Sequence, residues 1–422
     1  MLNKLSTSLV VIVSLLAVQV PFTDTVMAAE AATEKKKKRP THLVGPSVGK
    51  KIQKAFELYS AEVSDVDGAL EILLDIDASK TYDKAYTSRF IAIMYATKGK
   101  HEKEAISYLE KAVGPDILSE IDHAESLKLL GQLKMQTEDY KGALVSYNAW
   151  LEFTGKDDAN VWVAIAQANM ALKQLDKVIA PADKAIAAFG DKHNQNPYIL
   201  KMSSYYERKK YKEAIDVLET VIILFPDNKT WWTQLPMFYL LVENYDKALQ
   251  TLDLAYKQGY LEKEAQIKTL ASLYSTNGTP YMAAKLLEKH IASGLVTRDD
   301  RNIGTLANAW HAAQDIDKAA NYYGELAKMT NSAKHYRKQG MLLKQDNQFE
   351  KAIPAFNKAL SLGIKDEGRI YMSIAESHFY LEQYKPAYVA IKKAMEDPKS
   401  RKSARSWRSF IVDTANRKNV KL

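Results

Sequence analysis

A small residue recurs along this chain at intervals of 33 to 38 residues, from Ala69 to Ala387, with one valine among the ten occurrences. A large apolar residue usually follows each one four positions later, and a small or apolar one seven positions later. That spacing places all three side chains on one face of an α-helix. Such a helix cannot bury its apolar face alone, so the period predicts a single elongated stack of similar units. The ten anchors are Ala69, Ala105, Ala143, Val178, Ala214, Ala248, Ala283, Ala319, Ala352 and Ala387.

A second small residue lies twelve positions before six of the anchors and predicts a companion helix in each unit. Small side chains are expected at both places because two helices cross closely there, and a larger side chain would push them apart. These six residues are Gly131, Ala166, Ala271, Ala307, Gly340 and Ala375.

The unit between Trp231 and Asp253 shows the pattern most fully. Its first helix reads Trp-x-x-Leu-x-x-x-Tyr from Trp232, and its second begins with Tyr-x-x-Ala at Tyr245. With the period and the preceding Phe-Pro pair, these motifs resemble the tetratricopeptide repeat over residues 51–397. The resemblance implies an all-α solenoid, a right-handed superhelix of about ten helix-turn-helix repeats whose first helices line a concave groove.

Several residues depart from this pattern. Pro236 stands where a small residue is expected and predicts a kinked first helix. Pro181 and Pro354 lie early in second helices and should bend them modestly. The first two units have poor first helices, and Arg89 occupies a position that should be apolar. Trp231 is adjacent to Trp232 and must face another way, so it is the one aromatic residue there that packing leaves unexplained.

The N-terminal residues are typical of an export signal. Lys4 precedes an apolar run that is too short for an ordinary membrane span, and a small-residue site predicts cleavage after Ala28. Residues 1–28 are therefore expected to be a signal peptide, with an uncleaved anchor as the alternative. Residues 29–50, which contain Lys35 to Arg39, are expected to be a basic flexible linker. An exported protein without any cysteine cannot form disulfides, and this favours a location in a Gram-negative periplasm.

Residues 398–422 are strongly basic and carry an apolar stripe formed by Trp407, Phe410 and Ile411. This composition predicts a C-terminal capping helix with a basic outer face, because solenoids need a polar end. The basic ends of the chain suit an anionic membrane surface or an acidic partner. Ordinary solvated tails are the alternative interpretation.

Catalytic chemistry has no recognisable signature in this sequence. Without cysteine there is no thiol nucleophile and no thiolate metal site. The eight histidines lack metal-ligand spacing, and neither a nucleophile elbow nor a phosphate-binding glycine loop occurs. The acidic pairs Asp157-Asp158 and Asp299-Asp300 fall in predicted turns, where they should cap helices. We therefore expect no enzyme activity, no metal and no cofactor.

Binding is the favoured alternative, and the outward positions of the first helices predict where it occurs. In the C-terminal half these positions form a basic, hydrogen-bonding groove suited to an acidic peptide or a peptide carboxylate, or else simply a solvated face. Three further residues are candidates to stack on a glycan or a partner side chain. The groove residues are Lys268, Arg301, Asn308, His311, Lys334, Arg337, Lys344 and Arg369, and the three further residues are Trp231, Tyr206 and Met237.

The N-terminal sequence adds a more specific resemblance. The signal, the basic linker and the run Lys-Arg-Pro-Thr-x-Leu-Val-Gly-Pro are similar to those of repeat proteins that accompany TonB-type energy-transduction systems. This implies a non-enzymatic periplasmic scaffold that serves iron-chelate uptake and binds inner-membrane or periplasmic components of that system. A binding module for cell-envelope polysaccharide or peptidoglycan is the alternative. Neither a nucleic acid nor a small-molecule substrate is expected.

Overall fold

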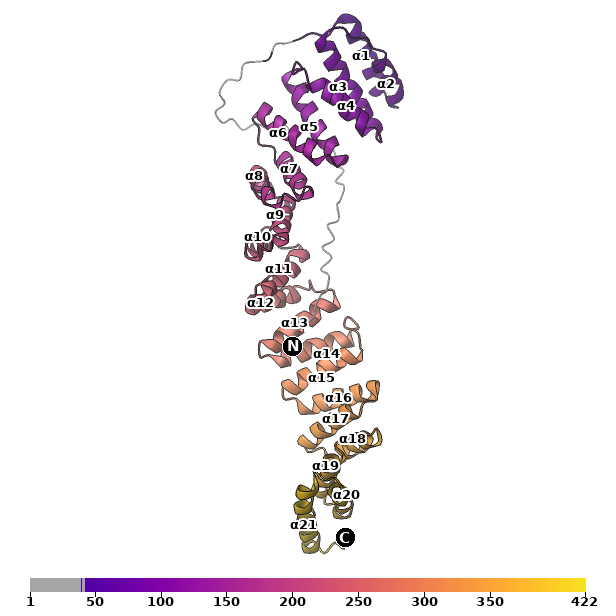
Figure 1. The fold of residues 1–422 in the computed structure, drawn as a ribbon, viewed down its shortest axis with the longest axis vertical. Helices are drawn as coiled ribbons and strands as arrows, with labels where there is room; N and C mark the ends of the chain where they lie inside the picture. The colour runs from indigo at the N-terminus through magenta and orange to yellow at the C-terminus, as the bar shows by residue number, and fades with distance from the viewer. Residues whose placement is uncertain (1–38, 40–41) are drawn as a thin grey trace.

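The computed structural model describes residue 39 and residues 42–422, which form 21 α-helices, two short 3₁₀ helices and no strand. Figure 1 shows the helices stacked in order into one long column, from α1 at one end to α21 at the other. Consecutive helices pair as first and second helices of ten units, and α21 closes the column. None of the helices in this part of the chain is long and apolar enough to cross a membrane.

The ten pairs are α1 (Pro46–Tyr59) with α2 (Val66–Leu74), α3 (Thr81–Lys98) with α4 (Glu102–Val113), α5 (Glu120–Gln136) with α6 (Tyr140–Thr154), α7 (Ala159–Ala171) with α8 (Ile179–Phe189), α9 (Gln195–Glu207) with α10 (Tyr211–Leu224), α11 (Lys229–Leu241) with α12 (Tyr245–Lys257), α13 (Glu264–Thr276) with α14 (Pro280–Ala292), α15 (Asp300–Ala312) with α16 (Ile316–Thr330), α17 (Ala333–Gln345) with α18 (Phe349–Ser361), and α19 (Glu367–Tyr380) with α20 (Tyr384–Glu396). The capping helix α21 spans Arg401–Arg417, and the 3₁₀ helices η1 (Leu175–Val178) and η2 (Gly190–Lys192) flank α8.

The anchors form the centre of each pair. All ten have an exposed fraction of 0%, and the residue four positions after each is buried as well. The small residues of the first helices are buried in the same way. At Gly340, a Cβ atom would lie 2.7 Å from the Phe356 ring, so glycine is required for the two helices to approach. The predicted all-α solenoid of ten helix pairs with a cap is therefore confirmed.

The turn inside each unit repeats as regularly as the anchors. In nine of the ten units, the residue five positions before the anchor has a positive φ, and Gly278 is the only glycine among them. In the unit of Ala248, Glu243 takes this conformation, and the next N–H, from Asn244, donates to the carbonyl of Tyr239 at 2.9 Å. This pattern is a Schellman motif, which satisfies the last carbonyls of the first helix.

The structure changes several expectations for the irregular units. The first two units have well-formed first helices, and α1 begins at Pro46, before the predicted start of the solenoid at residue 51. Helix α11 runs through Pro236, which is itself buried, as one continuous helix, and the kink expected at this residue stays a prediction. Arg89 is largely buried and bridges α3 to α5 through Asp122 at 3.2 Å and Glu125 at 2.5 Å, so a polar residue at this position holds two units together.

The end of the predicted linker is not free. Arg39 forms an ion pair with Asp116, donates to the carbonyl of Leu118 at 2.9 Å, and lies 4.6 Å from the centre of the Phe153 ring. The prediction of a flexible spacer up to residue 50 is therefore wrong for its last part, because Arg39 docks near the start of α5. The lysines before Arg39 and the expected cleavage site at Ala28 lie outside the described residues.

The hydrophobic core differs between two sections of the column. In the C-terminal section, α9 to α21, one continuous cluster of buried side chains runs from Tyr198 to Ile411. In the N-terminal section, α1 to α8, the described core is divided into five smaller clusters. Consecutive units of the N-terminal section are therefore joined by less continuous apolar contact.

Candidate binding face

The first helices of the C-terminal section present a row of cations at equivalent positions. Arg301, Lys334 and Arg369 lie in the first turns of α15, α17 and α19, and all three side chains are exposed. Among the residues that the structure describes, none of the three has an ion-pair partner. Lys402, in the first turn of α21, continues the row 33 residues after Arg369. We call Arg301, Lys334, Arg369 and Lys402 the cation row.

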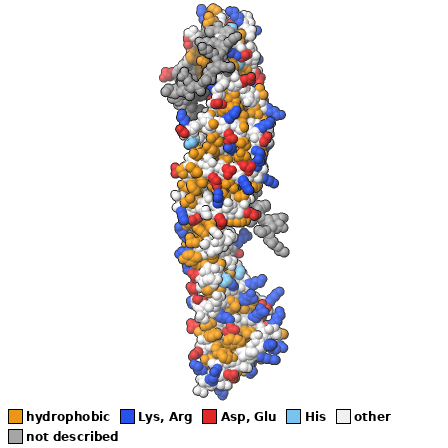
Figure 2. Space-filling view, turned by 90° about the vertical axis from the view of Figure 1, so that its left-hand side faces the viewer, with side chains coloured by type: hydrophobic (Ala, Val, Ile, Leu, Met, Phe, Trp, Pro, Cys, Tyr) orange, Lys and Arg blue, Asp and Glu red, His pale blue; other side chains and the backbone are white. Residues whose placement is uncertain are grey.

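The sequence pattern alone does not select Lys402, because α21 lies beyond the last repeat and is predicted only as a cap. The repeat period could nevertheless have identified it, because Lys402 lies one further repeat length after Arg369. Figure 2 shows Lys and Arg side chains gathered along one edge of the lower part of the molecule, which holds the last helices of the column.

Three of the predicted cations have carboxylate partners. Lys268 lies 3.5 Å from Glu264, Arg337 lies 3.6 Å from Asp366, and Lys344 is ion-paired with Glu376. The last two pairs link α17 to α19 or to the turn before it. These three side chains help to order the face, and their charge is partly neutralised in the free protein.

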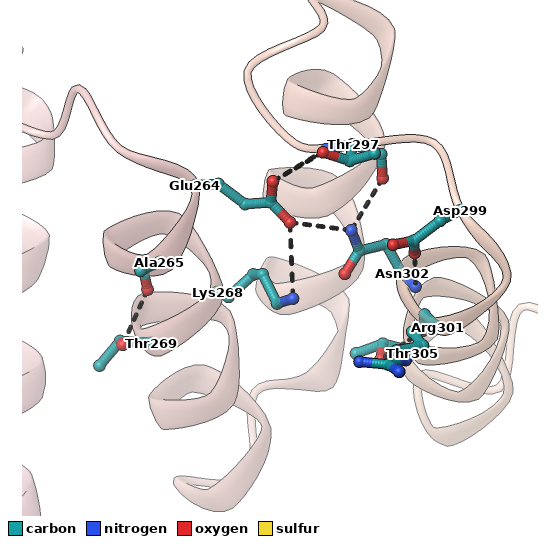
Figure 3. Close-up of polar contacts among 9 residues, drawn as sticks. All are labelled: Glu264, Ala265, Lys268, Thr269, Thr297, Asp299, Arg301, Asn302 and Thr305. Atoms are coloured by element: carbon teal, nitrogen blue, oxygen red, sulfur yellow. Dashed lines mark hydrogen bonds and ion pairs between the residues drawn. The ribbon is translucent and has the colours of Figure 1, made fainter. Parts of the chain in front are cut away.

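The surroundings of Glu264 show how such a partner is held (Figure 3). Its carboxylate accepts hydrogen bonds from the Thr297 hydroxyl at 2.8 Å and from the buried Asn302 amide at 2.9 Å. These hydrogen bonds, with the charge of Lys268, hold the pKa of Glu264 below its usual range. Glu264 thus stays ionised, and Lys268 already has a carboxylate partner within the protein. In the same view Arg301 makes no side-chain contact with this network.

Two other residues predicted to face the groove, Asn308 and His311, add no positive charge to it at neutral pH. The side-chain oxygen of Asn308 accepts a hydrogen bond from the Tyr323 hydroxyl, which fixes its orientation. His311 is half-buried, and burial, aided by the nearby charge of Lys338, lowers the pKa of its imidazole. At neutral pH this histidine therefore adds a hydrogen-bonding group and no charge.

The predicted aromatic contacts are largely internal. Trp231 is 3% exposed and belongs to the continuous core, so its prediction as a partner-binding residue is wrong. The buried stripe of α11 runs from Trp231 through Leu235. Trp232 is partly buried against the same core, and its indole N–H donates to the carbonyl of Pro226 at 2.7 Å. Tyr206 is half-buried, with its ring 5.6 Å from that of Phe238, and Met237 is also half-buried.

The acidic pairs behave as their positions predicted. Asp158 accepts hydrogen bonds from the backbone N–H groups of Asn160 and Val161 at the start of α7. Asp299 accepts one from the backbone N–H of Asn302 at the start of α15. Both are helix caps. The described residues contain no cluster of three potential metal ligands.

Comparison with known proteins supports the repeat type. Residues 336–362, in α17 and α18, match the tetratricopeptide repeat family model. No curated protein matches the chain. Similar solved structures include a tetratricopeptide repeat protein from Parabacteroides merdae, with 16% identity over 60% of this chain and 98% of that one and a TM-score of 0.34. Another is MamA from Desulfovibrio magneticus, with 17% identity over 42% and 96% and a TM-score of 0.34. A third is the P58(IPK) repeat domain, with 12% identity over 78% and 99% and a TM-score of 0.23.

Proposed function

We propose that this protein is a non-enzymatic protein-binding scaffold whose first-helix face, from α15 to α21, takes an acidic segment of a partner. The observation that carries this proposal is the cation row. Within the part of the chain that the structure describes, Arg301, Lys334 and Arg369 lack a carboxylate partner, although neighbouring cations have one. Extended repeat arrays present such faces to partners. Guanidinium groups can bind carboxylates through two hydrogen bonds, which gives direction as well as charge.

The position of the row favours an extended acidic segment over a single terminal carboxylate. Its members come from successive units, so they follow the long axis of the column and do not converge on one point. A terminal carboxylate clamp would instead use Lys268 with Asn308, and both of these side chains are engaged internally. The acidic segment should therefore meet several units at once.

Charge reversal tests this proposal directly. We expect the triple variant Arg301→Glu, Lys334→Glu and Arg369→Glu in the full chain to bind a fluorescein-labelled Glu/Asp-rich peptide at least tenfold more weakly, because exposed ion pairs contribute roughly 0.2–1 kcal/mol each and reversal adds repulsion. Fluorescence anisotropy would measure the affinity. The matched control, Lys285→Glu, Lys328→Glu and Lys358→Glu, changes the net charge equally on the exposed second helices α14, α16 and α18. If both variants lost the same peptide affinity, binding would depend only on net charge, and the proposed binding face would be wrong.

The cellular setting is a finer part of the proposal, and it rests on the N-terminal sequence. We propose that the chain is exported to the periplasm and serves a TonB-type energy-transduction system, in keeping with its signal-like start and the basic run after it. Capture of the intact tagged protein from envelope extracts, followed by mass spectrometry, tests this setting. Recovery of peptidoglycan without any inner-membrane transport component would instead support the polysaccharide alternative.

The polysaccharide alternative has lost its main support. Of its three proposed stacking residues, Trp231 is buried and Tyr206 packs against Phe238. Met237 cannot provide a ring for a sugar face. Contact with an anionic membrane through the basic residues of α21 stays a separate proposal, and it would be tested by sedimentation of the full chain with anionic and neutral vesicles.

A further inference from the structure

A group of aromatic side chains lies exposed at the C-terminal end of the column. Tyr380, the last residue of α19, is 59% exposed, and Phe410 on α21 is 48% exposed. Tyr380 stacks on Phe349, with ring centres 5.0 Å apart. Beneath them, Phe379 contacts the rings of both Tyr380 and Phe410. We call Phe349, Tyr380 and Phe410 the aromatic patch.

Closing the end of the column does not require this exposure. Helix α21 seals the core with Ala404, Ile411 and Ala415, which are all fully buried. Trp407 already packs against Phe379 from the same helix. A polar residue at position 410 would serve a simple cap equally well, and contiguous exposed apolar side chains typically mark an interaction site.

The aromatic patch and the cation row meet on one face of α19, through Tyr380 and Arg369. On α19, Arg369 and Tyr380 are eleven residues apart, which is close to three full helical turns, so both side chains project from the same side. Along the helix axis the separation is about 16 Å, at 1.5 Å per residue. An extended chain covers this distance in about five residues. One short segment can therefore reach both sites.

We propose that the aromatic patch binds a large apolar side chain of the same acidic partner segment, about five residues from its acidic run. This inference rests on the proposed function, because the cation row must hold the acidic run. The occupant is a peptide with adjoining acidic and apolar parts, since the patch continues a cationic face. Large aromatic side chains such as these commonly anchor binding surfaces.

Two labelled peptides test this inference on the full chain. The first contains only Glu, Asp, Gly and Ser, and the second is identical except for one leucine five residues from the acidic run. Burial of the leucine should make the second peptide bind about tenfold more tightly. Tyr380→Ser and Phe410→Ser should each remove most of that gain and leave the affinity for the first peptide unchanged. Val145→Ser, at a 71% exposed position on α6, is the matched control.

The outcomes separate the two proposals. Equal affinity for both peptides would overturn the aromatic patch and leave the acidic site intact. A leucine gain that survives both serine substitutions would also overturn it. Binding of neither peptide would contradict the proposed function, and the inference would fail with it. Because the Tyr380 ring is mostly exposed, Tyr380→Ser should fold normally, which circular dichroism would check.

Discussion

The N-terminal and C-terminal sections use the same helix pair but differ in how continuous the apolar contact between successive pairs is. From Tyr198 onward, buried apolar side chains form one cluster. Before that point the described core is divided into smaller clusters, and largely buried cations bridge the units. The side chains of Arg89 and Lys134 are each only 12% exposed and pair with carboxylates on neighbouring helices. Lys128 pairs with Asp158 across α5 and α7 at 2.6 Å.

This difference bears on function. The cations of the N-terminal section bridge units whose apolar contact is divided. In the C-terminal section, bridges such as Lys344–Glu376 add to one continuous core, and within the described residues Arg301, Lys334 and Arg369 have no carboxylate partner. In a solenoid, stability is roughly the sum of repeat stabilities and nearest-neighbour contacts. The C-terminal section should therefore unfold last and present a firm face to a partner, and the N-terminal section should unfold first.

The largest effect should come from removing a core ring in each section. Phe356→Ala should destabilise the C-terminal section by about 3–5 kcal/mol, because this fully buried ring would leave a cavity. Tyr147→Ala is the matched change in the N-terminal section. Hydrogen exchange during denaturant unfolding would follow each section separately. If either variant shifts both sections equally, the solenoid unfolds as one unit and the comparison between sections fails.

A smaller effect should come from the close helix crossings. Gly340→Ala would place a Cβ atom 2.7 Å from the Phe356 ring, and Gly131→Ala would do the same at Tyr147. Each should destabilise its own section by about 1–3 kcal/mol through overpacking. Gly304→Ala is the control, because its Cβ would meet Leu326 at an ordinary 3.5 Å. This control should be neutral or slightly stabilising in thermal unfolding, since alanine favours a helix interior.

The sequence predicted well those features that depend on local spacing. The ten anchors are buried as the period required, and Asp158 and Asp299 cap helices as their positions suggested. These outcomes follow from helical periodicity and from contacts within a few residues along the chain. The αL turn precedes nine of the ten anchors, but the residues that adopt it are mostly lysine, glutamate and glutamine, so composition gave no signal for it.

Sequence reasoning was weaker where side chains meet across units. Position alone selected Lys268, Arg337 and Lys344 as groove residues, and it could not show that each has a carboxylate partner. The repeat pattern places Trp232 in the core and leaves Trp231 outside it. In the structure Trp231 is the buried residue of α11 and Trp232 is only partly buried. The docking of Arg39 joins residues 77 to 79 positions apart along the chain, beyond the reach of any local pattern.

The pH dependence of Asp158 tests the role of ion pairs in the N-terminal section. Burial alone would raise the pKa of its carboxyl, but the Lys128 ammonium and two backbone N–H groups outweigh burial and lower it. Its contribution to stability is therefore complete above the unfolded pKa of about 3.9 and is lost as the pH falls through the lower folded value.

The charge-specific variant for this test is Asp158→Asn, which can still cap α7 but loses the ion pair. We expect it to melt below the wild-type protein at pH 6, and the difference should vanish in strong acid. Asp366→Asn, whose partner Arg337 lies 3.6 Å away, should have a smaller effect at pH 6. Equal effects of the two substitutions would contradict the greater dependence of the N-terminal section on ion pairs.

The smallest expected effect concerns the αL turns, which both sections share. Lys173 in the N-terminal section and Gln314 in the C-terminal section have φ values of 57° and 62°. Lysine and glutamine are strained there, and glycine is not, although glycine gains more freedom in the unfolded chain. Lys173→Gly and Gln314→Gly should therefore stabilise their own sections by less than about 1 kcal/mol. Gly278→Ala, at a φ of 73°, should destabilise by a similar amount. Because the local geometry is the same, the two glycine substitutions should give equal free-energy changes, even though the wild-type sections unfold at different denaturant concentrations. A clear inequality would show that the sections differ in their turns as well as in the contacts between units.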